Sequence, residues 1–111
     1  MSCPVMKRKA ARLAGVVSVQ TGVPAAALVG QEARSRRRFV ARNVRVARGM
    51  YLDLLTSLLP WPSCIVREVA ELVGLSHFTV KERLRFFRTQ KADPEVLALY
   101  QRTRKECEVM G

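Results

Sequence analysis

Apolar residues recur three or four positions apart along several segments of the chain, which is the spacing of one face of an α-helix. In residues 65–73 that face is formed by Ile65, Val66, Val69, Ala70 and Val73. Gly74 is expected to end this helix because glycine readily takes the left-handed conformation of a C-cap. Ser76 can cap a second helix by satisfying one of its free backbone N–H groups. The pattern therefore predicts two short helices joined by a tight turn.

The second of these helices, over residues 77–88, has two different faces. Val80, Leu84 and Phe87 lie four and three positions apart and should be buried together. The residues largely outside that face are His77, Phe78, Lys81, Glu82, Arg85 and Arg88. This pattern is typical of a helix-turn-helix, which offers its second helix to the major groove of DNA. A plain pair of packed helices inside a helical core is the simpler alternative.

Further helices are predicted before this pair. Residues 10–21 are apolar and helix-permissive, and Gly22 should end that helix. Pro24 suits the first turn of a short helix that follows. The longest helix is predicted over residues 39–59, where one apolar face is formed by Val40, Val44, Ala47, Tyr51, Leu54 and Leu58.

The ends of the chain complete this organisation. Asp93 can cap a last helix that has Pro94 in its first turn. Residues 1–9 are expected to form a flexible basic arm, and residues 107–111 a frayed tail. Between them, residues 10–106 are predicted to form one all-α domain, a helix-turn-helix bundle of about five to six helices.

The net charge indicates the kind of partner, because it is +11, with 20 Lys and Arg residues against 9 Asp and Glu. Such a balance favours a polyanion, which can be DNA, RNA or an acidic membrane surface. A ribosomal-type basic protein and a merely solvated basic surface are the alternatives. The helix-turn-helix pattern favours DNA, and an aromatic content of 6% leaves few stacking platforms for RNA bases.

Positive charge is concentrated between residues 34 and 48, where seven arginines occur without an acidic residue. The polar stretch of residues 31–38 can reach phosphates or a minor groove, or can be a solvated loop. Arg38, Arg42 and Arg45 project roughly opposite the apolar face of the longest helix, and Arg48 lies between the two faces. The imbalance favours phosphate contact over simple solvation.

Several kinds of chemistry find no support in the sequence. Cys3, Cys64 and Cys107 are widely separated, and His77 is the only histidine, so no zinc site is expected. No glycine-rich phosphate loop indicates a nucleotide, and we expect no cofactor. No run reaches transmembrane length, and scattered thiols suggest a reducing cytosol. No cysteine or carboxylate is placed to complete a catalytic group with His77, so an enzyme acting on a small molecule is not expected.

Two stretches, SRRRFVARNVRVARGMYLDLLT (residues 35–56) and VGLSHFTVKERLRFFR (residues 73–88), resemble the C-terminal DNA-binding domain of the bacterial replication initiator DnaA. The order of elements is similar over roughly residues 10–104. The run from Val40 to Arg42 matches the start of the family's V-A-R-P-R-Q segment, in which Asn43 replaces proline. In the family's recognition motif, (R/K)-D-H-T-T-V, the matching residues are His77, Thr79 and Val80. Ser76 replaces the aspartate of that motif and Phe78 its first threonine.

The resemblance implies a DnaA-like fold and a set of DNA contacts. The residues expected nearest to base edges in the major groove are Ser76, His77, Phe78, Thr79, Lys81 and Arg85. Arg36 or its neighbour Arg37 falls where the family places an arginine in the minor groove. Phosphate contacts, which carry no sequence information, are assigned to Arg34, Arg38, Arg42, Arg45 and Arg48.

The expected function is binding of double-stranded DNA in the regulation of replication initiation. With no ATPase module in its 111 residues, the chain is expected to be a stand-alone relative of the DnaA domain, monomeric, cytoplasmic and nucleoid-associated. One alternative is an adaptor or antagonist that binds a replication protein such as the initiator, for which the aromatic Phe78 would suit protein contact. Another is a transcription regulator that uses the same fold. No membrane partner is expected.

Overall fold

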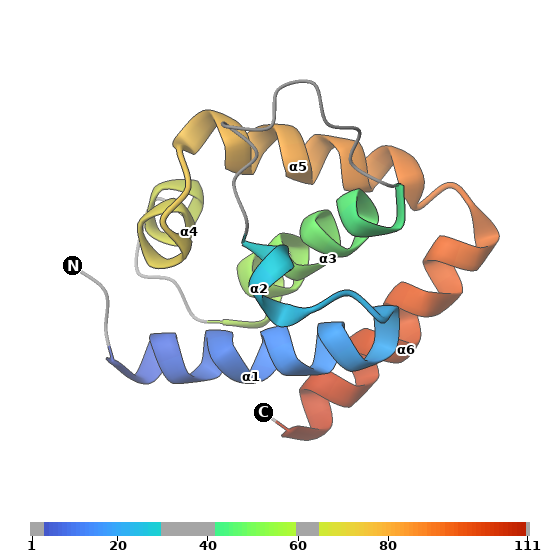
Figure 1. The fold of residues 1–111 in the computed structure, drawn as a ribbon, viewed down its shortest axis with the longest axis horizontal. Coiled ribbons are helices and arrows are strands. Elements are labelled where there is room, and N and C mark those ends of the chain that lie inside the picture. The colour runs from blue at the N-terminus through green and yellow to red at the C-terminus, as the bar shows by residue number, and fades with distance from the viewer. Residues whose placement is uncertain (1–3, 30–41, 60–64, 111) are drawn as a thin grey trace.

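The computed structural model describes residues 4–29, 42–59 and 65–110, and these residues form six α-helices (Figure 1). The helices are α1 (Pro4–Thr21), α2 (Ala25–Leu28), α3 (Arg42–Leu58), α4 (Ile65–Val73), α5 (His77–Gln90) and α6 (Pro94–Met110). No strand occurs within these three ranges, so the predicted all-α class is confirmed for them.

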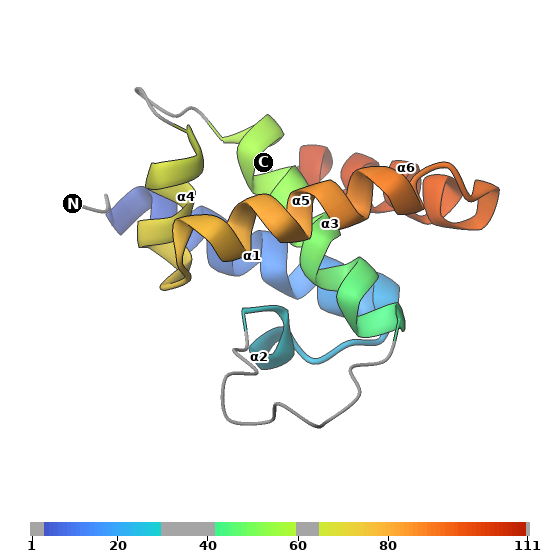
Figure 2. The same ribbon diagram turned by 90° about the horizontal axis from the view of Figure 1, so that it is seen from above.

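Helix α3 lies at the centre of the molecule and packs against each of the other five helices. Figures 1 and 2 show α1 on one side of it and α5 crossing it on the other. Residues 46–55 of α3 are buried with the exception of Asp53, which is half-buried. The sequence assigned α3 one apolar face and one arginine face. Arg42 and Arg45 are exposed as that prediction requires, but the middle of α3, residues 46–55, is covered by its neighbours nearly all round.

The predicted helix boundaries in the middle of the chain are confirmed by their local geometry. Gly22 and Gly74 end α1 and α4 with φ angles of 77° and 73°, which are left-handed values that glycine adopts without strain. Ser76 caps α5, since its Oγ accepts a hydrogen bond from the backbone N–H of Thr79 at 3.0 Å. Asp93 caps α6 by accepting from the backbone N–H of Glu95 at 2.9 Å.

Two segments near the ends of the chain, residues 4–9 and 107–110, are helical. Residues 4–9, expected to be a flexible arm, form the first part of α1, and α6 continues through residues 107–110, expected to fray. The reason is tertiary packing, since α1 and α6 lie against each other and Cys107 is only 2% exposed. The hydroxyl of Tyr51 also donates to the carbonyl of Ala10 at 3.2 Å, and burial raises the pKa of Tyr51 to about 12.

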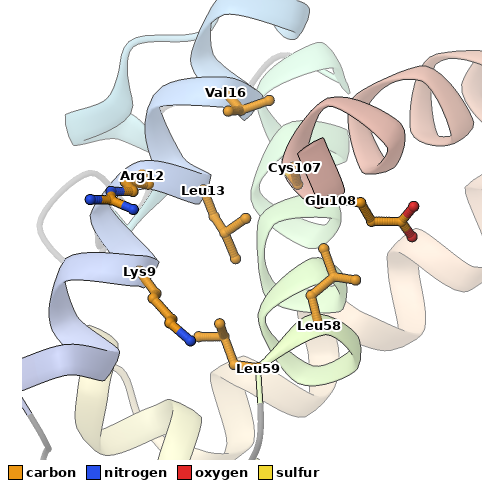
Figure 3. Close-up of a pocket in the computed structure, with 8 residues that line it drawn as sticks. All are labelled: Lys9, Arg12, Leu13, Val16, Leu58, Leu59, Cys107 and Glu108. Carbon is orange, nitrogen blue, oxygen red and sulfur yellow. The ribbon is translucent and has the colours of Figure 1, made fainter. Parts of the chain in front are cut away.

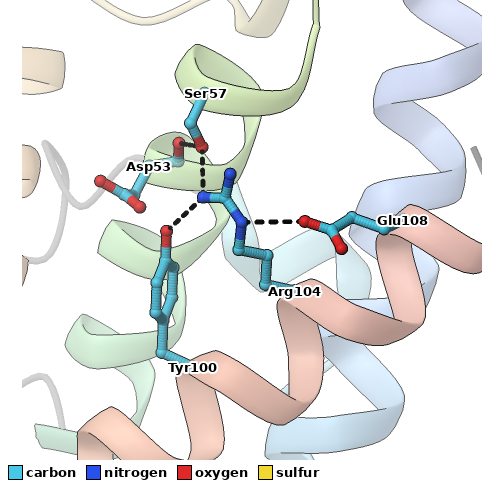
Figure 4. A network of polar contacts seen from close by, with 5 residues as sticks. All are labelled: Asp53, Ser57, Tyr100, Arg104 and Glu108. Carbon is cyan, nitrogen blue, oxygen red and sulfur yellow. Dashed lines mark hydrogen bonds and ion pairs between the residues drawn. The ribbon is translucent and has the colours of Figure 1, made fainter.

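A polar network joins α6 to α3 (Figure 4). The Nε atom of Arg104 forms an ion pair with the carboxylate of Glu108 at 3.1 Å. Its Nη1 atom donates hydrogen bonds to Tyr100 Oη at 3.0 Å and to Ser57 Oγ at 3.3 Å. Burial and hydrogen bonding to Asp53 raise the pKa of Tyr100, so its phenol stays neutral. The network fixes the C-terminal helix on the central one.

Within the described ranges, none of the helices combines the length and apolar character needed to cross a bilayer. Residues 1–3, 30–41, 60–64 and 111 lie outside the described structure. The predictions that concern Arg34, Arg36, Arg37 and Arg38 therefore fall on residues whose structure is not described.

Candidate nucleic-acid interface

Helix α5 is held on α3 by its inner face. Val80, Leu84 and Phe87 are buried there, as their spacing predicts. The two helices approach closely at Gly49, because the absence of a side chain there leaves room for the backbone of α5. A helix buried along one side against the central element of the core has a well-defined orientation. The opposite side of α5 is therefore a rigid surface.

The outer face of α5 is exposed and carries three basic side chains and one acidic one. Its exposed side chains are His77, Phe78, Lys81, Glu82, Arg85 and Arg88. Phe78 is 71% exposed, which is unusual for an aromatic side chain of a small domain. Arg85 Nη1 lies 3.6 Å from the carboxylate of Glu82 one turn earlier. The structure thus brings His77, Phe78, Lys81 and Arg85 together on one surface, together with an acidic residue to which the sequence gave no role.

Ser76 and Thr79, the other two predicted base contacts, lie at the N-terminal end of that face. Ser76 is exposed and Thr79 is half-buried. Ser76 Oγ donates to Thr79 Oγ1 at 2.8 Å in addition to accepting from the Thr79 backbone. The two hydroxyls are therefore engaged in the capping structure, and their positions relative to the helix are defined.

The arginines of α3 occupy three different environments. Arg45 is exposed, with its guanidinium carbon 4.0 Å from the centre of the Phe86 ring. Arg42 donates from Nε to Gln90 Oε1 at 2.8 Å and pairs through Nη2 with Asp93 at 3.2 Å. The backbone N–H of Glu95 holds the pKa of Asp93 below its ordinary value, and Arg42 lowers it further. Arg42 thus joins the start of α3 to the turn before α6, although more than half of its side chain stays exposed.

Arg48 has the least access to solvent of the three. It is 9% exposed, and its Nε donates to the carbonyl of Ala27 in α2 at 2.8 Å. Burial lowers the pKa of Arg48. This placement makes Arg48 a support for α2 and removes most of its surface from contact with DNA. Its predicted role as a phosphate ligand is correspondingly weakened, whereas Arg45 has the exposure that such a role needs.

Arg83, which the sequence did not single out, supports the same short helix. Its Nη1 lies 3.5 Å from the carbonyl of Leu28, the last residue of α2. Burial, and then the charge of Arg48, lower the pKa of Arg83 to about 10. A signal was available, because residue 83 lies three positions after Val80 and four before Phe87, at the edge of the buried face.

A separate hollow of about 280 Å³ is lined by residues of α1, the end of α3 and α6 (Figure 3). Helix α1 lies on the other side of α3 from α5 (Figure 1). Leu13, Leu58 and Cys107 line the hollow, and Lys9 and Glu108 also border it. Burial, followed by the nearby Glu106 and Glu108 carboxylates, raises the pKa of the Cys107 thiol to about 11. The thiol is therefore protonated at neutral pH and is a poor nucleophile.

We expect Cys107 to react with iodoacetamide at pH 8 at least a hundredfold more slowly in the folded protein than in urea, because its thiolate fraction falls by roughly that factor. The rate can be followed by mass spectrometry in a variant with Cys3→Ser and Cys64→Ser. The same variant in urea is the control. Equal rates in the two conditions would show that Cys107 is not buried as the structure has it.

Among the described residues, no group of three or more His, Cys, Asp or Glu side chains is placed to hold a metal ion. Comparison with protein-family models, with curated proteins and with solved structures finds no match for this chain. Function is therefore inferred from the outer face of α5 and the charges around it.

Proposed function

We propose that this protein binds double-stranded DNA by inserting the outer face of α5 into the major groove. The observation that carries the proposal is the combination of a rigidly packed helix with an exposed basic face at its capped end. An α-helix fits the width of the major groove, and exposed polar side chains on its N-terminal half can reach base edges. The net charge of +11 supports the same conclusion, because backbone phosphates attract such a protein to any duplex.

In this proposal α4, the turn at Gly74 and α5 act as a helix-turn-helix of the DnaA type. Lys81 and Arg85 would donate to guanine O6 and N7, and the Phe78 ring would contact a thymine methyl group. Glu82 would accept from the amino group of cytosine. Arg45 would contact phosphate, and the arginines of residues 34–38 would reach phosphates and the adjacent minor groove.

His77→Ala is expected to weaken binding to the preferred duplex by about 1–3 kcal/mol, because a base-edge hydrogen bond is lost. The preferred duplex is found by selection from random oligonucleotides, and its affinity is measured by fluorescence anisotropy. His77 is exposed at the end of a helix, so the folded state should tolerate the change. Lys105→Ala, at an exposed position on α6, is the matched control and should leave sequence preference unchanged.

The selection itself tests the proposal. Failure to enrich any duplex would contradict DNA reading by α5, as would full retention of affinity in both His77→Ala and Phe78→Ala. Enrichment of sites similar to the DnaA box would support a role in replication control. Enrichment of a different motif would instead favour a transcription regulator.

The exposure of Phe78 also favours a second function, that of an adaptor or antagonist that binds a replication protein. Aromatic side chains are frequent anchors at protein interfaces. Co-purification with a replication initiator, with and without nuclease, separates the two functions. An association that survives nuclease and is lost in Phe78→Ala would support the adaptor, and its complete loss after nuclease would exclude it.

A further inference from the structure

Helix α1 carries a concentration of positive charge to which the DNA-binding proposal gives no role. Its first half contains four basic residues, Lys7, Arg8, Lys9 and Arg12. The whole of α1 contains no Asp or Glu. None of the four side chains takes part in the ion pairs found among the described residues. Glu108 borders the same hollow as Lys9, but its carboxylate is paired with Arg104 at 3.1 Å.

These basic side chains form a strip along the outer side of α1. At about 100° per residue, Arg8 and Arg12 project from one face of the helix, one turn apart, and both are exposed. Lys7 and Lys9 flank that face on its two sides; the first is exposed and the second half-buried. The face opposite to the basic strip is buried and is formed by Ala10, Leu13 and Val17.

The basic strip and the proposed base-reading face lie on different sides of the molecule. Figures 1 and 2 show α1 on one side of α3 and α5 crossing α3 on the other. Because α1 packs on α3 and α6, its outer side points away from the core. A straight duplex in contact with the outer face of α5 would not reach it. The basic strip therefore stays accessible to a second polyanion while α5 is occupied.

The burial of α1 favours nucleic acid over a lipid surface as that polyanion. A basic amphipathic helix that binds a membrane inserts its apolar face among the lipids. In α1 that face is already covered by the core, and the large apolar side chains exposed on the helix are Val5 and Val19, which lie 14 positions apart. Backbone phosphates require no apolar contact, and arginine guanidiniums match their oxygens.

We propose that the basic strip of α1 binds the phosphate backbone of a second DNA duplex while α5 holds the first, so that one molecule bridges two duplexes. The inference rests on the proposed function, which accounts for the first duplex. Arg8 and Arg12 are the direct phosphate ligands, and Lys7 and Lys9 add to the attraction. Phosphate contacts carry no sequence information, so the second duplex can have any sequence.

Bridging is measured by immobilising the duplex selected for α5 and following the capture of a fluorescent duplex of unrelated sequence by the full chain. The Arg8→Gln, Arg12→Gln double variant is expected to lower the affinity for the second duplex about tenfold. The slope of log affinity against log salt should fall by about 1.8, or 0.9 for each lost contact. Binding to the immobilised duplex should change little, since α5 is intact. The matched control is Arg8→Lys, Arg12→Lys, which keeps both charges and should retain capture.

The outcomes distinguish this inference from the proposed function. If the immobilised duplex binds in a His77-dependent way, but the second is not captured or its capture is unchanged in the Gln variant, bridging is overturned and DNA reading by α5 stands. Duplex binding that depends on Arg8 and Arg12 but not on His77 would contradict both proposals, because α1 would then be the single DNA surface. Binding to phosphatidylserine vesicles that is lost in the Gln variant, without capture of a second duplex, would assign the basic strip to a membrane and overturn bridging.

Discussion

Gly49→Ala is expected to destabilise the protein by about 2 kcal/mol, because overpacking costs up to about 3 kcal/mol and alanine's helix propensity returns about 1. A Cβ at position 49 would lie 2.5 Å from Phe87 Cβ and 2.8 Å from the carbonyl oxygen of Arg83. Neither atom can rotate away, so relief requires α5 to move from α3. Thermal unfolding followed by circular dichroism should show a Tm lower by roughly 10 °C.

Gly15→Ala provides the matched control, because the glycine is helical and exposed and an added Cβ meets nothing within 4 Å. There the better helix propensity of alanine should stabilise the protein by up to about 1 kcal/mol. If Gly49→Ala is as stable as the parent protein, α3 and α5 do not cross as closely as in the structure. The orientation of the proposed base-reading face would then need revision.

The helix boundaries that sequence predicted correctly depend on interactions within a few residues. A glycine with positive φ ends α1 and α4, and Ser76 and Asp93 satisfy backbone N–H groups two or three residues later. The residue type and its position are enough to predict each N-cap, because the N–H group that the cap satisfies belongs to the residues immediately after it. The buried face of α5 was also predictable, since its spacing is regular and its residues are large and apolar.

The predictions that failed depended on contacts between distant parts of the chain. The basic run near the N-terminus suggested an arm, yet α1 continues back to Pro4 because its inner face packs on α3 and α6. Residues 107–110 remain helical because Cys107 is buried in the same region. No local pattern indicates which distant surface will cover a short segment.

The candidate site shows the same division between local and distant information. The outer face of α5 follows from its own spacing, and the structure places His77, Phe78, Lys81 and Arg85 together on it. The different environments of Arg42, Arg45 and Arg48 do not follow from sequence. Their partners are Asp93, the Phe86 ring and the carbonyl of Ala27, which are 51, 41 and 21 positions away. The three arginines therefore differ in their surroundings: Arg42 and Arg45 stay exposed, whereas Arg48 is nearly buried against α2.

Phe87→Ala is expected to destabilise the protein by about 3–5 kcal/mol, because it leaves a large cavity in the core. The side chain is 0% exposed, and its ring centre lies 5.4 Å from that of Tyr100 in α6. The residue also borders the close approach of α5 to Gly49, so its loss should loosen α5 from both α3 and α6. Urea unfolding at constant pH measures the change as a shift in the midpoint.

Phe78→Ala is the control on the opposite face of the same helix, and it distinguishes stability from recognition. Because Phe78 is 71% exposed, its removal should change the free energy of unfolding by no more than about 0.5 kcal/mol. The same variant should lose affinity for the selected duplex, whereas a structural phenylalanine would affect both quantities together. Equal destabilisation by the two substitutions would mean that residue 78 is packed inward, and α5 would then have no exposed face with which to read DNA.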